Sequence, residues 1–247
     1  MSGDILILRR ITEAFRKQDW FTVAVETLIV VLGVFLGLQV NNWNGERSLR
    51  GEQAQYLHQL AAEYAVIETT LAKHVARYSG SVDATRAMLR YLDSDAPVDQ
   101  DVLVQLVEAI DAYPIPPGSP AALRELISSG KMGLIRNREL RTALMRLNDH
   151  IELLARAYDG NASESSMLLL AIQPYLDLAL TGTPGDMASR PQVSVTRVDL
   201  DRMREDEDVT TAMKIFLKIH ANMLFLDSLV LDEVRAVRTA LEGELDN

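Results

Sequence analysis

The sequence predicts an all-α protein: one N-terminal transmembrane helix followed by an elongated antiparallel helical bundle. Two observations lead to this class. An uninterrupted apolar run lies near the N-terminus, and apolar residues recur every three or four positions through most of the remaining chain, which is the period of an amphipathic helix. The only short stretch typical of a strand is VSVTRV, 193–198. With 247 residues, 48% of them hydrophobic, the chain can fold around its own core.

The apolar run at residues 20–40 carries a single charge, Glu26. A helix of this length, at about 1.5 Å per residue, spans about 31 Å, the thickness of the hydrocarbon core of a bilayer. The only two tryptophans of the chain, Trp20 and Trp43, bracket the run, and tryptophan is enriched at the headgroup level. We therefore expect a transmembrane helix over 19–44 with both tryptophans as membrane-interface anchors, and we favour it over a buried helix of a soluble protein.

The charges around the run predict its orientation. Four basic residues precede it, whereas two lie within a similar distance after it, so the positive-inside bias places residues 1–18 in the cytoplasm. Residues 45–247 then form an extracytoplasmic domain, and we expect a single-pass protein of a bacterial inner membrane with a periplasmic domain. The segment before the run is long and no small-residue cleavage pattern follows it, which favours an uncleaved signal anchor.

One face of the expected membrane helix holds Glu26, Val30, Gly33 and Gly37. At about 100° per residue these positions fall within about 60° of one another. Small residues let two membrane helices approach closely, and a carboxyl group in a membrane helix faces protein or water. This face predicts an interface for a homo-oligomer. The alternative is an oligomeric ion-conducting, proton-conducting or sensory protein in which Glu26 lines the path.

Two segments resemble a known family. The membrane run ends GLQVNNWN (37–44) with Glu26 ahead of it, and LRELISSGKMGLIRNRELRTAL (123–144) holds Leu-x-Ser-Ser-Gly-Lys followed by Asn-x-x-Leu-Arg. Both are similar to segments of an uncharacterised bacterial family of single-pass membrane proteins, a domain of unknown function. The resemblance covers at least residues 20–145.

The resemblance has two departures. Gly45 stands where an acidic residue often follows Asn-Trp-Asn, and Met132 stands where leucine is usual. What the resemblance implies is a helical protein anchored in the inner membrane. It brings no catalytic residues.

The first half of the bundle is predicted from periodicity and helix-end signals. Apolar residues between Leu49 and Leu92 follow a step near 3.6, which predicts one long helix over 46–93. A short helix begins at Asp99 or Gln100 and ends before the prolines at 114–117. Ser119 is expected to cap the next helix, with Pro120 at its first position and Gly130 at its end.

The second half contains two further long helices. Asn137 begins one, whose apolar pattern is expected to continue to Leu180 with a bend at Pro174. Residues 181–208 are rich in Gly, Pro and charge and are predicted to be a mobile loop. The last helix has apolar residues at all ten core positions between Val209 and Leu241, as a central bundle helix requires.

Composition and motifs exclude several functions. A net charge of −10 argues against a nucleic-acid partner. The chain has no cysteine, and its four histidines lack the spacing of a metal site, so we expect no metal, no cofactor and no enzymatic activity. Gly130 and Lys131 do not form a phosphate loop, because Glu125 and Met132 stand where that motif needs Gly and Ser or Thr.

The interpretation is therefore a membrane-anchored scaffold or partner-binding protein. Its expected partners are the lipid bilayer, further copies of the chain and another membrane or periplasmic protein. The turn with Ser128, Ser129 and Lys131 is a candidate surface for a partner or ligand.

Overall fold

The computed structural model describes residues 20–110, 114–181 and 192–246 and divides the chain into two compact units, Met1–Ala54 and Gln55–Asn247. The expected cytoplasmic segment 1–18 lies outside the described residues. The elements are α2 (Trp20–Leu92), α3 (Gln100–Ile110), α4 (Ala121–Ser128), η1 (Lys131–Leu134), α5 (Arg138–Ile172), η2 (Gln173–Tyr175), β1 (Leu176–Thr181), β2 (Gln192–Val198), α6 (Leu200–Arg204) and α7 (Glu207–Leu245).

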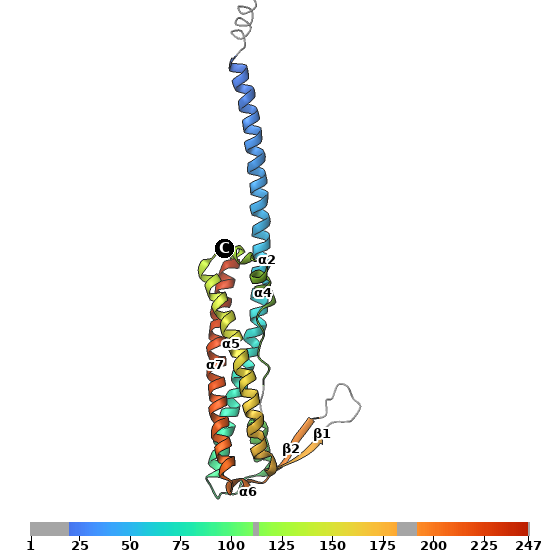
Figure 1. The fold of residues 1–247 in the computed structure, drawn as a ribbon, viewed down its shortest axis with the longest axis vertical. Coiled ribbons are helices and arrows are strands. Elements are labelled where there is room, and N and C mark those ends of the chain that lie inside the picture. Colours follow the sequence, from blue (N-terminus) through green and yellow to red (C-terminus); the bar gives the residue numbers. More distant parts are fainter. Residues whose placement is uncertain (1–19, 111–113, 182–191, 247) are drawn as a thin grey trace, which may run out of the picture. The chain divides into compact units, whose positions relative to one another are not determined.

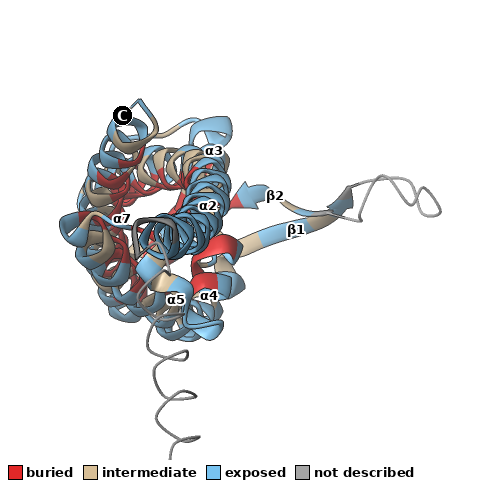
Figure 2. Cartoon of the chain, turned by 90° about the horizontal axis from the view of Figure 1, so that it is seen from above, coloured by how far each residue is buried: buried red, intermediate tan, exposed pale blue. Residues whose placement is uncertain are grey.

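The second unit is an antiparallel bundle of long helices, as expected. Helix α7 packs antiparallel to the α2 residues of this unit and to α5 (Figure 1). The buried residues of the helices face the centre of the bundle, whereas the outer sides are exposed (Figure 2). Apolar residues of all three helices share one core cluster, and α3, β2, α6 and the first turns of α7 contribute to a second cluster.

Helix α7 confirms the periodicity analysis. Its ten predicted core positions are all buried except Leu226, which is partly buried. Two polar residues, His220 and Asp227, are buried on the same helix. The side chain of Asp206 accepts a hydrogen bond from the backbone N–H of Asp208 and caps the helix N-terminus.

The pattern in α2 holds for most of its length in the second unit. Leu60, Tyr64 and Leu71 are fully buried. Leu49, which the periodicity assigned to the packing face, is exposed. The buried positions of α2 begin at Tyr56. The packing face therefore starts later in the helix than the periodicity predicted.

Helix α5 begins as predicted and ends earlier. The Asn137 side chain accepts hydrogen bonds from the N–H groups of Glu139 and Leu140. The helix stops at Ile172, and the expectation that it continues to Leu180 was wrong. Pro174 lies in the following 3-10 turn, where its missing N–H and its ring prevent continuation of the α-helical hydrogen bonds.

A β-hairpin replaces the end of that helix and part of the expected mobile loop. Strands β1 and β2 pair antiparallel, with an irregularity after Asp177. The prediction that residues 181–208 form one mobile loop was wrong, because β2 and α6 lie within this range; residues 182–191 are outside the described part. The Gln100 side chain of α3 bonds both backbone groups of Val198, each at 3.0 Å, and fixes the end of β2 on the bundle. The all-α class therefore holds except for this hairpin.

The start of α4 is capped from another helix. Ser119 was expected to cap it, but the helix begins one residue later, at Ala121, and no side chain of its own segment caps it. Instead the Glu63 carboxylate of α2 accepts a hydrogen bond from the Ala122 N–H at 3.2 Å. At the other end Gly130 adopts the left-handed conformation (φ 70°), as predicted for a glycine that ends a helix.

Candidate functional site

The N-terminal part of α2 is a long, apolar and exposed helix. It is long and apolar enough to cross a membrane, and none of its apolar window is buried. A Cβ added at Gly33 or Gly37 would meet no atom within 4 Å, so the face that these glycines share with Glu26 and Val30 is open. Whether this face joins copies of the chain stays a prediction.

The two expected anchor residues, Trp20 and Trp43, both lie in α2. Trp20 is the first residue of α2, but its side chain lies outside the described part. Trp43 is exposed, and the guanidinium carbon of Arg47 lies 5.7 Å from its ring centroid. A cation over an indole face is a favourable pair at an aqueous boundary.

Both serines of the turn after α4 form hydrogen bonds within the turn. The hydroxyls of Ser128 and Ser129 donate to the same backbone oxygen, that of Glu125, at 3.2 and 2.7 Å. Both serines and Lys131 are exposed. The same oxygen also accepts the backbone N–H of Ser129 at 2.9 Å, so both hydroxyls are held within the turn that ends α4. A partner or ligand surface here stays a prediction.

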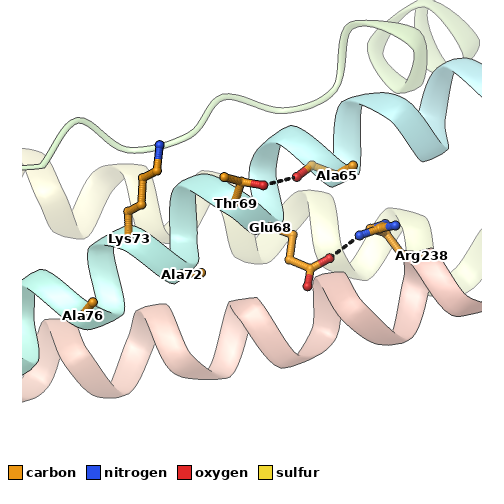
Figure 3. Close-up of a pocket in the computed structure, with 7 residues that line it drawn as sticks. All are labelled: Ala65, Glu68, Thr69, Ala72, Lys73, Ala76 and Arg238. Carbon is orange, nitrogen blue, oxygen red and sulfur yellow. Dashed lines mark hydrogen bonds and ion pairs between the residues drawn. The ribbon is translucent and has the colours of Figure 1, made fainter.

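A groove of about 520 Å³ runs along α2 in the second unit. Figure 3 shows its small side chains on one strip of the helix, beside the ion pair between Glu68 and Arg238. The Thr69 hydroxyl donates to the Ala65 carbonyl, so it is satisfied within the helix. Glu68 also binds Arg235, and the Arg238 hydrogen bond holds the pKa of Glu68 below its ordinary value.

A second groove, of about 630 Å³, lies where the hairpin leaves the bundle. Residues of α2, α3 and α5 line it together with both strands. Leu170, Leu178 and Val193 at this groove are exposed, and Leu180 further along β1 is 78% exposed. Isolated apolar side chains at a surface are ordinary, but several along one groove mark an interaction surface. The alternation of Leu176, Leu178 and Leu180 was the sequence signal that could have revealed it.

The centre of the bundle contains a polar cluster that the sequence analysis missed. The hydroxyl of Tyr158 on α5 lies 2.9 Å from Nδ1 of His74 on α2 and donates to Oδ2 of Asp227 on α7 at 2.7 Å. All three residues are buried. A tyrosine hydroxyl has one proton, so when it donates to Asp227 it accepts from His74, and His74 then carries its proton on Nδ1.

Burial changes the acidity of the cluster. It raises the pKa of Asp227 to about 6, while the Tyr158 hydrogen bond opposes this rise. It lowers the pKa of His74 and lowers that of neighbouring His220 to about 4. Burial, together with the Asp227 carboxylate, also raises the pKa of Tyr158. At neutral pH both histidines are uncharged, and Asp227 is the ionised member.

His220 and Ser165 extend the cluster. The His220 ring lies between Tyr78 and Phe216, with centroid distances of 5.9 and 5.7 Å. Neither of its ring nitrogens has a hydrogen-bond partner in the described part of the chain, and the Ser165 hydroxyl has none there either. Unpaired buried polar atoms are costly, so each one in a native fold calls for a reason.

Sequence reasoning missed this cluster because its members lie far apart. Tyr158 is 84 residues from His74 and 69 from Asp227. A signal was present in α7, where His220 and Asp227 fall seven residues apart on the apolar side of the helix. The described residues bring no three His, Asp or Glu side chains into a metal-binding group.

Comparison with known proteins adds no relative. No family model, no curated protein and no solved structure matches the chain. The resemblance carried by residues 37–44 and 123–144 therefore stays a prediction.

Proposed function

We propose that the protein is a membrane-anchored helical scaffold that self-associates through its N-terminal helix and binds a partner with its bundle. The observation that carries the proposal is the run of exposed apolar side chains in α2 from Val23 to Val40. In water such a surface would be strongly unfavourable, whereas acyl chains accept it. The expected orientation has the N-terminus in the cytoplasm and residues 45–247 in the periplasm.

Self-association is supported by the open glycine face. Gly33 and Gly37 leave room for a second backbone, and Glu26 on the same face is disfavoured against lipid. Two helices in contact there would bury the carboxyl group and gain close packing.

The test of association uses Gly33→Leu and Gly37→Leu in full-length protein. Each substitution places a bulky side chain at the contact, so we expect dimer or oligomer affinity in mild detergent to fall by about tenfold or more, about 1.4 kcal/mol. Val31→Leu, on the opposite side of the helix, is the matched control. Measurement is by crosslinking and sedimentation. Wild-type association by both glycine variants would remove the interface.

Anchoring has a separate test. The chain should stay in the membrane fraction after alkaline carbonate treatment, and a reporter fused to its C-terminus should be active only outside the cytoplasm. Release by carbonate, or a reporter active in the cytosol, would contradict the proposal whatever the oligomeric state.

Partner binding is supported by the groove beside the hairpin. It combines exposed apolar side chains of α5 and the hairpin with the polar residues Arg77, Glu108 and Gln173, the mixture typical of a protein interface. Crosslinking from native membranes with a photoreactive group at Leu178 should capture a partner. The same group at Leu153, an exposed leucine of α5 that does not line this groove, is the control and should capture none.

A further inference from the structure

A cavity of about 200 Å³ adjoins the buried polar cluster. Its walls come from all three long helices and from the proline segment: Tyr78 of α2, Tyr158 and Ser165 of α5, His220 of α7, and Pro114 and Pro116. All of these residues belong to the second compact unit. The cavity is larger than an engineered apolar cavity of about 150 Å³ that holds benzene, so one substituted ring fits.

The polar groups of the cavity are built into the core. Ser165 and His220 line it with 0% and 1% of their surfaces exposed. The Ser165 hydroxyl and both His220 nitrogens are unpartnered in the described part of the protein. A neutral imidazole offers one donor and one acceptor, and a hydroxyl offers both. These groups match a ligand that itself has one N–H or O–H group.

Three of the residues that line the cavity, Tyr78, Tyr158 and His220, have planar rings. The ring of Tyr78 lies 6.1 Å from that of Tyr158 and 5.9 Å from that of His220, and Pro114 and Pro116 also line the cavity. Ring faces at these separations favour a planar guest in offset or edge contact. An aliphatic guest of the same volume would use these faces less well.

The charges of the residues that line the cavity restrict which small molecules can bind there. The cavity has no lysine or arginine among its lining residues, so a carboxylate or phosphate would lose its hydration without a counter-charge. Its one acidic lining residue, Asp159, is exposed, where water screens its attraction for a cation. An uncharged guest avoids both penalties.

We propose that this cavity is a binding site for a small, uncharged, single-ring aromatic molecule with one hydroxyl or ring N–H, which bonds to Ser165 and His220 and packs against Tyr78 and Tyr158. The site is independent of membrane association. It gives the bundle a ligand-binding function beyond that of a scaffold.

The experiment uses full-length protein in lipid nanodiscs with ¹⁵N-labelled histidine, and phenol as the probe. The chain has four histidines, and His220→Gln identifies the His220 ring signals. Phenol should shift these signals saturably and leave those of exposed His58 unchanged. Toluene should bind at least fivefold more weakly than phenol, because it cannot pair with the two polar groups.

Two variants separate the site from general partition into lipid. Ser165→Ala should weaken phenol binding roughly fivefold to tenfold, while Ser166→Ala, an exposed neighbour, should leave it unchanged. Ala162→Phe places a ring at the cavity wall and should abolish the shift of the His220 signals. Far-UV circular dichroism reports whether this variant is folded. If it is unfolded, the phenol affinity of Ser165→Ala alone tests the site. A missing or unsaturable His220 shift, unchanged binding in Ser165→Ala, or tighter binding of benzoate or benzylamine would overturn the proposal.

Discussion

At the scale of single residues, two buried ionisable groups of α7 have opposite effects on stability. Asp227 keeps its proton in the folded state up to about pH 6, against an ordinary pKa of 3.8, so its contribution is full at low pH and is lost as pH rises through 6. His220 has a folded pKa of about 4 against 6.5, so the unfolded chain binds its proton more tightly and stability rises from pH 4 to 6.5. The two dependences nearly cancel.

Removing either Asp227 or His220 should reveal the pH dependence that the other gives to stability. We expect Asp227→Asn to give a protein whose free energy of unfolding rises by about 3 kcal/mol between pH 4 and 7, because the His220 contribution, with that of His74 in the same direction, is no longer opposed. His220→Leu should give the reverse, a smaller fall, because His74 still opposes the Asp227 contribution. Urea unfolding of full-length protein in detergent at several pH values measures both. His58→Gln, at an exposed position, is the control. If the free energy of unfolding depended on pH equally in all three variants, Asp227 and His220 would not be the groups responsible.

Two buried tyrosine hydroxyls should respond differently to removal. Tyr158→Phe deletes the hydroxyl that joins His74 to Asp227 and leaves both without this partner, so we expect a loss of about 2–3 kcal/mol in the free energy of unfolding. The hydroxyl of fully buried Tyr64 has no partner in the described residues. Tyr64→Phe should therefore be neutral or slightly stabilising. Thermal and urea unfolding of the pair tests this, and a similar loss in both variants would contradict it.

At the scale of elements, the cap of α4 is a tertiary contact. Glu63→Ala removes the acceptor of the Ala122 N–H and should cost about 1 kcal/mol, the usual value of a helix cap. Ser119→Ala should change stability little, because this hydroxyl does not cap the helix. Urea unfolding measures both changes. A larger loss of stability in Ser119→Ala than in Glu63→Ala would instead support Ser119 as the cap of α4.

One glutamine of α3 is hydrogen-bonded to the end of the hairpin. Gln100→Ala removes both hydrogen bonds to the Val198 backbone, so the amides of β2 should exchange with solvent at least tenfold faster. Gln105→Ala, an exposed position of the same helix, is the control. Hydrogen exchange with mass spectrometry reads the peptide that covers β2. Unchanged exchange would show that the apolar contacts of the hairpin hold it without Gln100.

The elements that the sequence predicts well are those whose signal is local. The buried positions of α7 and the Asn137 cap of α5 depend on period and helix-end chemistry within a few residues. The sequence indicated a strand only at 193–198, within β2; β1 was missed because residues 176–180 continue the apolar content of α5. The bond between Tyr158 and Asp227 joins residues 69 positions apart, and no local pattern contains such a contact.

At the scale of the whole molecule, charge is divided unevenly along the chain. Residues 1–54 hold six basic and six acidic residues, so the net charge of −10 belongs to residues 55–247. An acidic domain is repelled by anionic lipid headgroups, and the repulsion acts within about 10 Å at 0.1 M salt. Any surface that the domain binds tightly by charge should be basic.

This division predicts how the bundle behaves near lipid. In nanodiscs, changing zwitterionic lipid to anionic lipid at low salt should leave hydrogen exchange of α5 and α7 unchanged, because the acidic bundle does not adsorb to either surface. The helix segment 23–40 should stay protected in both. Protection of α5 or α7 that appears only with anionic lipid, and disappears with salt, would show adsorption and contradict this expectation.

The Tyr158 hydroxyl has a consequence that reaches across the bundle. When Asp227 takes up a proton on the oxygen that faces Tyr158, the carboxylic acid becomes the donor and the hydroxyl turns toward Nδ1 of His74. His74 must then hold its own hydrogen on Nε2. Protonation of Asp227 on α7 is thus coupled, through the hydroxyl of Tyr158 on α5, to a change of the His74 tautomer on α2.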